Sequence, residues 1–187
     1  MVQKSVVGTV IMDAPAIDRA LARMAHEIVE ETGDVEELAI VGIQRRGAQL
    51  AERIADEIEH TEGRAPAKGV MDITLYRDDL QAISDQAIVQ KTEMPFKVEG
   101  KTIVLVDDVL YTGRTVRAAL NEIMDFGRPK RVLLAVLIDR GHREIPVRAD
   151  FVGKNVPTSR TQQIKVKVDE LDGTREVELV EREEAGL

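Results

Sequence analysis

Apolar positions in the first third of the chain follow helix-like and strand-like spacings in turn. Behind the candidate N-cap Asp13, apolar residues recur every three or four positions, at Ile17, Leu21, Met24 and Ile28. This spacing predicts an amphipathic helix that ends at Gly33. A continuous apolar run follows at residues 38–43, and a second helical pattern covers about residues 48–59. The order predicts a strand, a loop and a helix.

The middle of the chain repeats this alternation. Strand patterns cover residues 70–76, 102–106 and 131–138, and a helical pattern covers residues 115–126. Gly127, with Pro129 close behind it, is typical of a helix end. Alternating strands and helices predict an α/β fold with a mostly parallel sheet flanked by helices.

Two segments break the alternation. Residues 77–98 are mostly polar, and a stretch of this length without regular structure is typical of a flexible lid over an active site. Residues 164–168 and 176–180 alternate in polarity around Asp172-Gly173, which predicts an antiparallel hairpin. Because 187 residues is the size of one domain, we expect a single domain over residues 1–187.

Composition narrows the class of protein. Apolar residues make up 43% of the chain and charged residues 32%, which is ordinary for a globular protein. The sequence has neither a membrane-spanning apolar run nor a signal-peptide pattern, so we expect a cytoplasmic protein that does not bind membranes. The lack of cysteine excludes disulfides, and His26, His60 and His142 have no metal-ligand spacing. A net charge of −8 argues against indiscriminate nucleic-acid binding but permits a local basic patch.

Residues 104–115 combine features of a phosphate site and a sugar site. An apolar strand runs into the paired acids Asp107 and Asp108, and the chain then passes through Thr-Gly-Arg-Thr at 112–115 into a helix. A turn at a helix N-terminus offers unpaired N–H groups and the positive end of the helix dipole, which suit a dianionic phosphate. Carboxylates at a strand end accept hydrogen bonds from a sugar diol. The alternative is that the acids only end a strand and the turn only caps a helix.

This pattern resembles the signature of the type I phosphoribosyltransferases, in which four apolar residues, two acids and an apolar-rich turn lead into Thr-Gly-x-Thr. The resemblance implies the fold of that family and binding of 5-phosphoribosyl 1-pyrophosphate (PRPP). It implies that the two acids hold the ribose hydroxyls and that the turn holds the 5-phosphate. The residues of this implied site are Asp107, Asp108, Val109, Leu110, Tyr111, Thr112, Gly113, Arg114 and Thr115.

Two loops are implied to complete the donor site. Arg45, Arg46 and Gly47 follow the first strand, where the family contacts pyrophosphate, and a guanidinium fits phosphate oxygens in bidentate fashion. Which arginine points inward stays open, and a solvated loop is the alternative. Arg77 begins residues 77–98, which resemble the mobile catalytic loop of the family. Closure of that loop would exclude water, whereas a merely solvent-facing loop is the alternative.

Residues 72–79 and 138–155 narrow the branch of the family. They resemble the bacterial pyrimidine operon attenuation regulators that are also uracil phosphoribosyltransferases, and the resemblance extends over nearly the whole chain. It implies a hood and hairpin over about residues 139–187, with a base site at Asp139, Arg140, Phe151 and Val152. The alternatives are core packing for Phe151 and a simple ion pair between Asp139 and Arg140.

The same resemblance implies a messenger RNA partner. It implies that a basic face of a homodimer or homotetramer binds a stem-loop in the leader of pyrimidine operon mRNA. The matching cations are Arg23, His26, Arg143, Arg148 and Lys154. Scattered surface charge is the alternative, and Glu30-Glu31 adds acidic charge near the end of the same predicted helix.

The implied function is therefore twofold: conversion of uracil and PRPP to UMP and pyrophosphate, and binding of leader RNA. Asp107, Asp108 and Arg77 are the expected catalytic residues, without a covalent intermediate. Mg²⁺ is expected to arrive with PRPP rather than on direct protein ligands. UMP or UTP in the nucleotide site would favour the RNA-binding state. A salvage phosphoribosyltransferase without an RNA role, and a nucleotide sensor that lacks catalysis, are the two alternatives.

Overall fold

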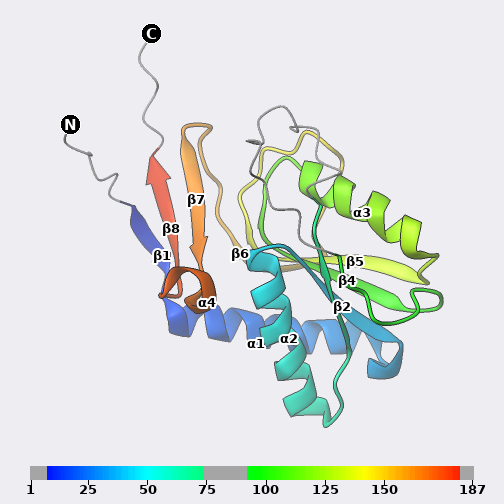
Figure 1. The fold of residues 1–187 in the computed structure, drawn as a ribbon. Helices are drawn as coiled ribbons and strands as arrows, with labels where there is room; N and C mark the ends of the chain where they lie inside the picture. The colour runs from blue at the N-terminus through cyan, green and yellow to red at the C-terminus, as the bar shows by residue number, and fades with distance from the viewer. Residues whose placement is uncertain (1–7, 74–91, 182–187) are drawn as a thin grey trace.

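A five-stranded parallel sheet with helices on both faces forms the larger part of the structure (Figure 1). The computed structural model describes residues 8–73 and 92–181. The strands lie in the order β3-β2-β4-β5-β6. Their bounds are Leu38–Ile43 for β2, Ala67–Met71 for β3, Thr102–Leu110 for β4, Arg131–Asp139 for β5 and Phe151–Asn155 for β6. The predicted α/β fold with a mostly parallel sheet is confirmed.

Alternate residues of the central strands face two separate apolar cores. In β2, Leu38 and Ile40 pack with helices α1 and α2, whereas Ala39 and Val41 pack with helix α3 on the other face. A strand that is buried on both faces has no polar side, which explains the continuous apolar run in the sequence. The helices are α1 at Ala14–Thr32, η1 at Val35–Glu37, α2 at Arg46–Glu62, α3 at Arg114–Phe126 and α4 at Asp169–Asp172.

The first helix begins and ends where the sequence predicts. The Asp13 carboxylate accepts a hydrogen bond from the Ala16 N–H at 2.9 Å, as expected of an N-cap. Gly33 ends the helix at a φ of 75°, a conformation that suits glycine, and its N–H donates to the Val29 carbonyl. The predicted strand at residues 38–43 is also confirmed without a shift.

Three predicted boundaries are wrong. Helix α2 begins at Arg46, not at residue 48, so Arg46 and Gly47 lie in its first turn rather than in a loop. Strand β3 ends at Met71, five residues before the predicted end, and residues 74–76 lie outside the described part of the chain. Strand β4 continues to Leu110 because β5 pairs with it that far, so the two acids lie within the strand rather than after it.

Most of the predicted lid, including Arg77, lies outside the described residues. The described residues 92–98 return beside β3, where Val70 and Glu93 exchange two backbone hydrogen bonds of 2.8 Å. Val98 is buried in the core on the α3 side of the sheet. This end of the predicted loop is therefore packed against the sheet.

A three-stranded antiparallel sheet stands beside the parallel one (Figure 1). Its strands are β7 at Gln162–Lys167, β8 at Glu176–Glu181 and β1 at Thr9–Met12, in the order β1-β8-β7. The predicted hairpin is confirmed, with α4 as its connection, whereas β1 is not predicted by the sequence pattern. Strand β6 pairs in parallel with β5. None of the helices in the described ranges has the length and apolar character needed to cross a membrane.

Candidate functional site

The two acids of β4 lie near the carboxyl end of the parallel sheet. Asp107 is 8% exposed, and its Oδ1 accepts the Asp108 N–H at 2.9 Å. Oδ1 of Asp108 accepts the Val109 N–H at the same distance. Burial raises the pKa of the Asp108 carboxyl, while its hydrogen bonds and the positive charge of Arg46 lower it. A sugar hydroxyl that donates to Asp108 would favour the charged carboxylate.

The turn from β4 into α3 has the geometry of a phosphate socket. Gly113 precedes α3 at a φ of 93°, a conformation that L side chains rarely adopt. The Thr112 carbonyl accepts backbone N–H groups of Glu144 at 2.9 Å and Ile145 at 3.0 Å, which fixes the turn. The first N–H groups of a helix lack acceptors within the helix, so this turn offers donors to an anion.

The first turn of α2 meets β4 directly beside these acids. A Cβ on Gly47 would lie 2.5 Å from the Val106 carbonyl oxygen and 3.1 Å from the Cα of Asp107, so only glycine permits this approach. The peptide bond between Gln44 and Arg45 is cis. The close approach at Gly47 places residues 45–47 next to the acid pair.

The two arginines of this segment have different environments. Arg46 forms a bidentate ion pair with Asp172 of α4, with Nη2 to Oδ1 at 2.8 Å and Nε to Oδ2 at 3.3 Å. Arg45 is exposed and forms neither a hydrogen bond nor an ion pair within the described residues. Arg46 is held by the protein, whereas the side chain of Arg45 remains available to a ligand.

A hollow of about 470 Å³ opens at the carboxyl ends of β5 and β6. Asp139 and Arg140 line it together, but Asp139 forms its ion pair with Arg143 and not with Arg140. The simple Asp139–Arg140 pair considered from the sequence is therefore not what the structure contains. Asn155 and Thr158 also line the hollow, and the sequence pattern does not indicate either of them.

Arg140 is a buried cation that organises one wall of this hollow. Its Nε donates to the Thr158 hydroxyl at 3.1 Å, and its Nη2 donates to the Gln162 carbonyl at 2.6 Å. The guanidinium carbon lies 4.0 Å from the ring centre of Tyr111, a cation–π contact. His142 approaches the same ring edge-on, at 6.0 Å between centres. These two contacts hold the Tyr111 ring beside Arg140, directly before the turn at residues 112–115.

The other two residues of the implied base site have structural contacts. Phe151 is 5% exposed and packs in the core with α1 and α2, which is the core alternative considered from the sequence. The carbonyls of Val152 and Gly153 accept Nη2 of Arg23 at 3.0 and 2.8 Å. These contacts join α1 to β6.

Most of the implied RNA-binding cations are exposed, and three of the five have partners within the protein. Arg23 pairs with Glu27 at 2.8 Å, and Lys154 donates to the Ile11 carbonyl at 3.0 Å. Arg143 is turned inward, where it donates to the Tyr111 carbonyl at 2.9 Å. His26 and Arg148 are exposed. An acidic hollow of about 490 Å³ adjoins α1 and is lined by Glu27, Glu30, Glu31, Asp150 and Phe151.

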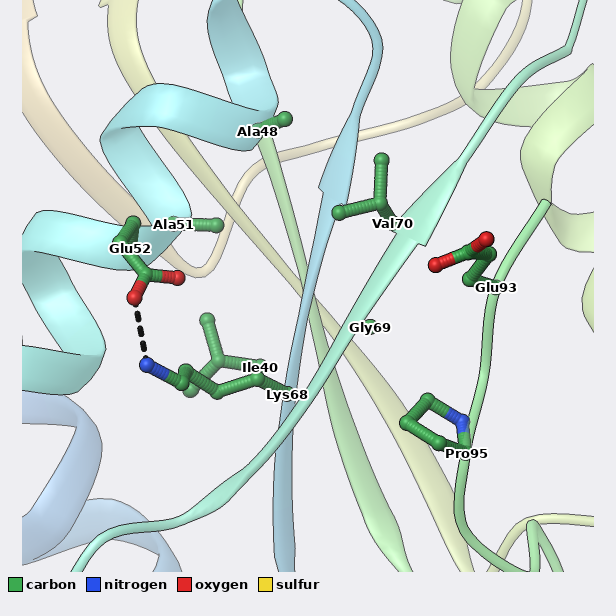
Figure 2. Close-up of a pocket in the computed structure, with 9 residues that line it drawn as sticks. All are labelled: Ile40, Ala48, Ala51, Glu52, Lys68, Gly69, Val70, Glu93 and Pro95. Atoms are coloured by element: carbon green, nitrogen blue, oxygen red, sulfur yellow. Dashed lines mark hydrogen bonds and ion pairs between the residues drawn. The ribbon is translucent and has the colours of Figure 1, made fainter. Parts of the chain in front are cut away.

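A further small cavity of about 120 Å³ lies between α2 and β3 (Figure 2). Aliphatic side chains such as Ile40 and Ala51 line it, and the Glu52–Lys68 ion pair borders it. It lies at the edge strand of the sheet rather than at the acid pair. Across the described ranges, no cluster of three or more histidine, aspartate or glutamate side chains is arranged to hold a metal.

The chain is similar to known phosphoribosyltransferases. Residues 8–170 match the family described as the phosphoribosyl transferase domain. The chain is 61% identical to the bifunctional protein PyrR of Thermus thermophilus, over 94% of this chain and 97% of that protein. It is 52% identical to the bifunctional protein PyrR of Deinococcus radiodurans, over 93% of this chain and 95% of that protein.

Solved structures share the fold at low sequence identity. A hypoxanthine phosphoribosyltransferase from Staphylococcus aureus superposes with a TM-score of 0.69 at 16% identity, covering 97% of this chain and 98% of that one. The hypoxanthine phosphoribosyltransferase of Trypanosoma cruzi gives a TM-score of 0.71 at 14% identity, covering 96% and 100%. These two similarities concern the fold alone.

Proposed function

Because the chain belongs to the phosphoribosyl transferase domain family and, within it, to the bifunctional PyrR proteins, we propose that it converts uracil and PRPP to UMP and pyrophosphate. We propose further that it regulates pyrimidine operons by binding their leader RNA. One observation supports the enzymatic role most directly: Asp107, Asp108 and the phosphate socket at residues 112–115 lie in sequence where β4 meets α3. We expect the protein to act in the cytoplasm, where mRNA and PRPP occur.

The proposed reaction exchanges one bond at the ribose C1 for another. The bond from C1 to the pyrophosphate oxygen breaks, the bond from C1 to a uracil nitrogen forms, and that nitrogen loses its proton. Asp107 and Asp108 orient the ribose through its hydroxyls and stabilise positive charge that develops on the ring. The N-terminus of α3 holds the 5-phosphate, and Arg77 of the predicted lid remains a proposed catalytic residue.

Arg45 and Arg46 have separate roles in this proposal. Arg45 is free of protein partners among the described residues, so its guanidinium is the one that adapts to pyrophosphate. Arg46 is oriented by Asp172 and supplies fixed positive charge beside Asp108. An unpaired cation and a fixed cation together compensate the charge of the leaving group.

We propose that Mg²⁺ enters this site bound to PRPP. Asp107 and Asp108 place two carboxylates where the ribose diol is proposed to bind, and their negative charge suits a donor that arrives with its own Mg²⁺, without either carboxylate binding the ion directly. When bound, Mg²⁺ supplies charge neutralisation for pyrophosphate. The protein's part is to hold the ribose and phosphate groups that carry the ion.

The hollow beside Arg140 is the proposed base site. Its wall includes Asp139 and Arg140, as the sequence resemblance implies, and it opens next to the Tyr111 ring. Because Phe151 packs in the core, we propose that it supports this wall from behind rather than contacting the base. Backbone groups at the ends of β5 and β6 are the proposed readers of the uracil edge.

The enzymatic proposal is tested by steady-state release of pyrophosphate with uracil, hypoxanthine and orotate as competing acceptors. We expect uracil to be used in preference to the other two. Asp108→Asn is expected to lower kcat/KM for PRPP by about 100-fold, because an oriented charge-bearing group is lost at the reacting ring. Thr112→Val removes a hydroxyl donor from the phosphate socket and should weaken UMP binding.

Asp56→Asn is the matched control for these variants, because Asp56 is an exposed carboxylate on α2 remote from the acid pair. It should leave the kinetics unchanged. Unaltered UMP synthesis in Asp108→Asn and Thr112→Val would exclude the proposed site. UMP binding without any release of pyrophosphate from PRPP and uracil would instead favour a nucleotide sensor.

A salvage enzyme without an RNA role is the second candidate function. It is favoured by one observation: Arg23 and Lys154 have partners within the protein, and Glu27, Glu30 and Glu31 lie on the same helix as Arg23. Negatively charged side chains next to the phosphate backbone of RNA weaken RNA binding. Dimer or tetramer formation, which would double the cations along a two-fold axis, is part of the RNA proposal and not of the salvage one.

A further inference from the structure

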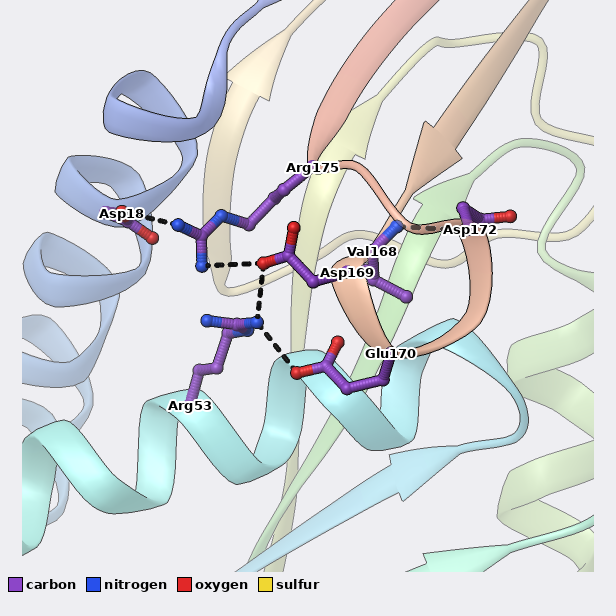
Figure 3. Close-up of polar contacts among 7 residues, drawn as sticks. All are labelled: Asp18, Arg53, Val168, Asp169, Glu170, Asp172 and Arg175. Carbon is purple, nitrogen blue, oxygen red and sulfur yellow. Dashed lines mark hydrogen bonds and ion pairs between the residues drawn. The ribbon is translucent and has the colours of Figure 1, made fainter.

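The acidic side chains of helix α4 pair with arginines from two other segments of the chain (Figure 3). Arg53 of α2 pairs with Asp169 at 3.2 Å and with Glu170 at 2.7 Å. Arg175, just before β8, pairs with Asp169 at 3.4 Å and with Asp18 of α1 at 3.0 Å. The connection between the strands of the hairpin is thereby attached to both helices on one face of the parallel sheet.

Asp172 is the member of this group that reaches the proposed pyrophosphate segment. Its carboxylate accepts two hydrogen bonds from Arg46 and one from the Val168 N–H at 2.9 Å. Val168 immediately precedes α4, so this hydrogen bond joins the two ends of the short helix. It fixes the direction of the Asp172 carboxylate. The Arg46 guanidinium holds the pKa of Asp172 below its ordinary value, so the carboxylate stays charged to lower pH than an unpaired aspartate would.

Arg46 retains binding capacity while it is paired. A guanidinium has five N–H donors, and the contact with Asp172 uses Nε and Nη2. Arg46 begins α2, and the next residue, Gly47, packs on β4 at Asp107. The Arg46 side chain is also part-exposed, at 37%. The pair therefore directs the guanidinium without withdrawing it from the acid pair.

We infer that Asp172 is a positioning residue of the proposed pyrophosphate site, which holds Arg46 so that its remaining N–H groups meet the leaving pyrophosphate. This inference rests on the proposed function. Asp169 anchors α4 through its ion pairs with both Arg53 and Arg175. The anchored helix holds Asp172 in place, and Asp172 in turn holds Arg46. The C-terminal hairpin thus contributes to the donor site through its connection, although its strands lie in a separate sheet.

The test compares binding of pyrophosphate and of UMP to Asp172→Asn by calorimetry, together with KM for PRPP. We expect pyrophosphate affinity to fall and KM for PRPP to rise by about tenfold, the scale of one charge-assisted hydrogen bond. UMP affinity should be unchanged, because UMP uses the socket at residues 112–115. A variant that merely loosened the fold would lower both affinities together.

Glu170→Gln is the matched control, because it removes one carboxylate charge from the same helix without touching Arg46. It should leave pyrophosphate and UMP binding unchanged. Asp172→Asn should also have no further effect in an Arg46→Gln background, because Asp172 is proposed to act through Arg46 alone. Asp172→Glu should recover part of the lost pyrophosphate affinity by restoring the charge.

Three results would overturn the inference: tighter pyrophosphate binding in Asp172→Asn, an equal loss of UMP binding, or the same effect in Glu170→Gln. Tighter binding would mean that Asp172 competes with pyrophosphate for Arg46. The wild-type chain distinguishes this failure from failure of the proposed function. If wild type binds neither pyrophosphate nor UMP, the proposed function is overturned and the inference with it.

Discussion

Glu122 of α3 is a buried carboxyl that has no role in the proposed reaction. It is 5% exposed, and one oxygen accepts the Thr92 hydroxyl while the other has no hydrogen-bond partner among the described residues. The same Thr92 hydroxyl accepts the Asp72 N–H at 3.0 Å. The Thr92 hydroxyl thus connects Asp72, which follows β3, with Glu122 of α3.

Glu122 is expected to make stability depend on pH. Burial, with the nearby charges of Asp72 and Asp125, raises the pKa of Glu122 above its ordinary value. The folded state then binds the proton more tightly than the unfolded state, so stability falls as the pH rises from the ordinary pKa through the raised one. Glu122→Gln removes this penalty while it keeps an oxygen acceptor for Thr92.

Thermal unfolding at pH 4 and pH 8 measures this effect. Relative to wild type, Glu122→Gln should gain a few degrees in Tm at pH 8 and little or nothing at pH 4. An exposed carboxylate on α2, changed in Glu62→Gln, should show no such difference between the two pH values. A gain of equal size at both pH values would contradict the assignment to Glu122 ionisation.

For single residues, the sequence predicts sites whose residues are close in the chain, but it does not predict which residues from distant segments form ion pairs or hydrogen bonds with them. Asp107, Asp108 and the turn at residues 112–115 are recognised because their spacing in the chain is also their spacing in the site. The partners of Arg46 and Glu122 lie 126 and 30 residues away. No local pattern marks Asp172 or Thr92 as such a partner, because the contacts depend on how whole elements pack.

Element boundaries near the site depend on pairing and close packing. Strand β4 continues past its polar residues because Val109 and Leu110 still pair with β5. Helix α2 begins two residues early because Gly47 lets its first turn approach β4. Strand β1 escapes prediction because it is four residues long and its partner β8 lies near the other end of the described chain. Long amphipathic elements such as α1 are predicted correctly because their own pattern suffices.

Gly47→Ala is expected to damage both stability and the donor site. Its Cβ would lie 2.5 Å from the Val106 carbonyl oxygen, so α2 must move away from β4. We expect a loss of about 1–3 kcal/mol in the free energy of unfolding, typical of overpacking. Pyrophosphate binding should weaken at the same time. Urea denaturation and calorimetry measure the two effects.

Gly33→Ala is the comparison for this variant. An alanine at position 33 would also be strained, because the backbone φ there is 75°. However, no atom lies within 4 Å of the added Cβ. It should cost about 1 kcal/mol of stability and leave pyrophosphate binding intact. Equal binding losses in the two variants would show that general destabilisation, rather than the position of α2, controls the site.

For the whole molecule, the balance of charge limits how RNA can bind. The net charge is −8, and Arg23 and His26 share α1 with Glu27, Glu30 and Glu31. Attraction to phosphate must therefore come from a few well-placed cations and from shape, rather than from a general positive field. The exposed members of the implied set are Arg23, His26, Arg148 and Lys154, whereas Arg143 is half-buried.

RNA binding is tested by titrating a pyrimidine operon leader stem-loop and a scrambled RNA at several salt concentrations, with and without UMP. The RNA proposal predicts a preference for the leader that UMP strengthens. Arg148→Gln should reduce the slope of log affinity against log salt by about 1, as expected when one phosphate contact is lost. Equal binding of both RNAs would remove the regulatory role and leave the salvage function.

The pairing of β1 with β8 has a consequence for synthesis of the protein. Among the described elements, β1 at residues 9–12 is translated first and β8, which completes its hydrogen bonds, is translated last. At about 5–20 residues per second, roughly ten to thirty seconds separate the two. Throughout that interval the nascent chain can assemble the sheet around β2 and β4, but its small antiparallel sheet must wait for translation to reach β8.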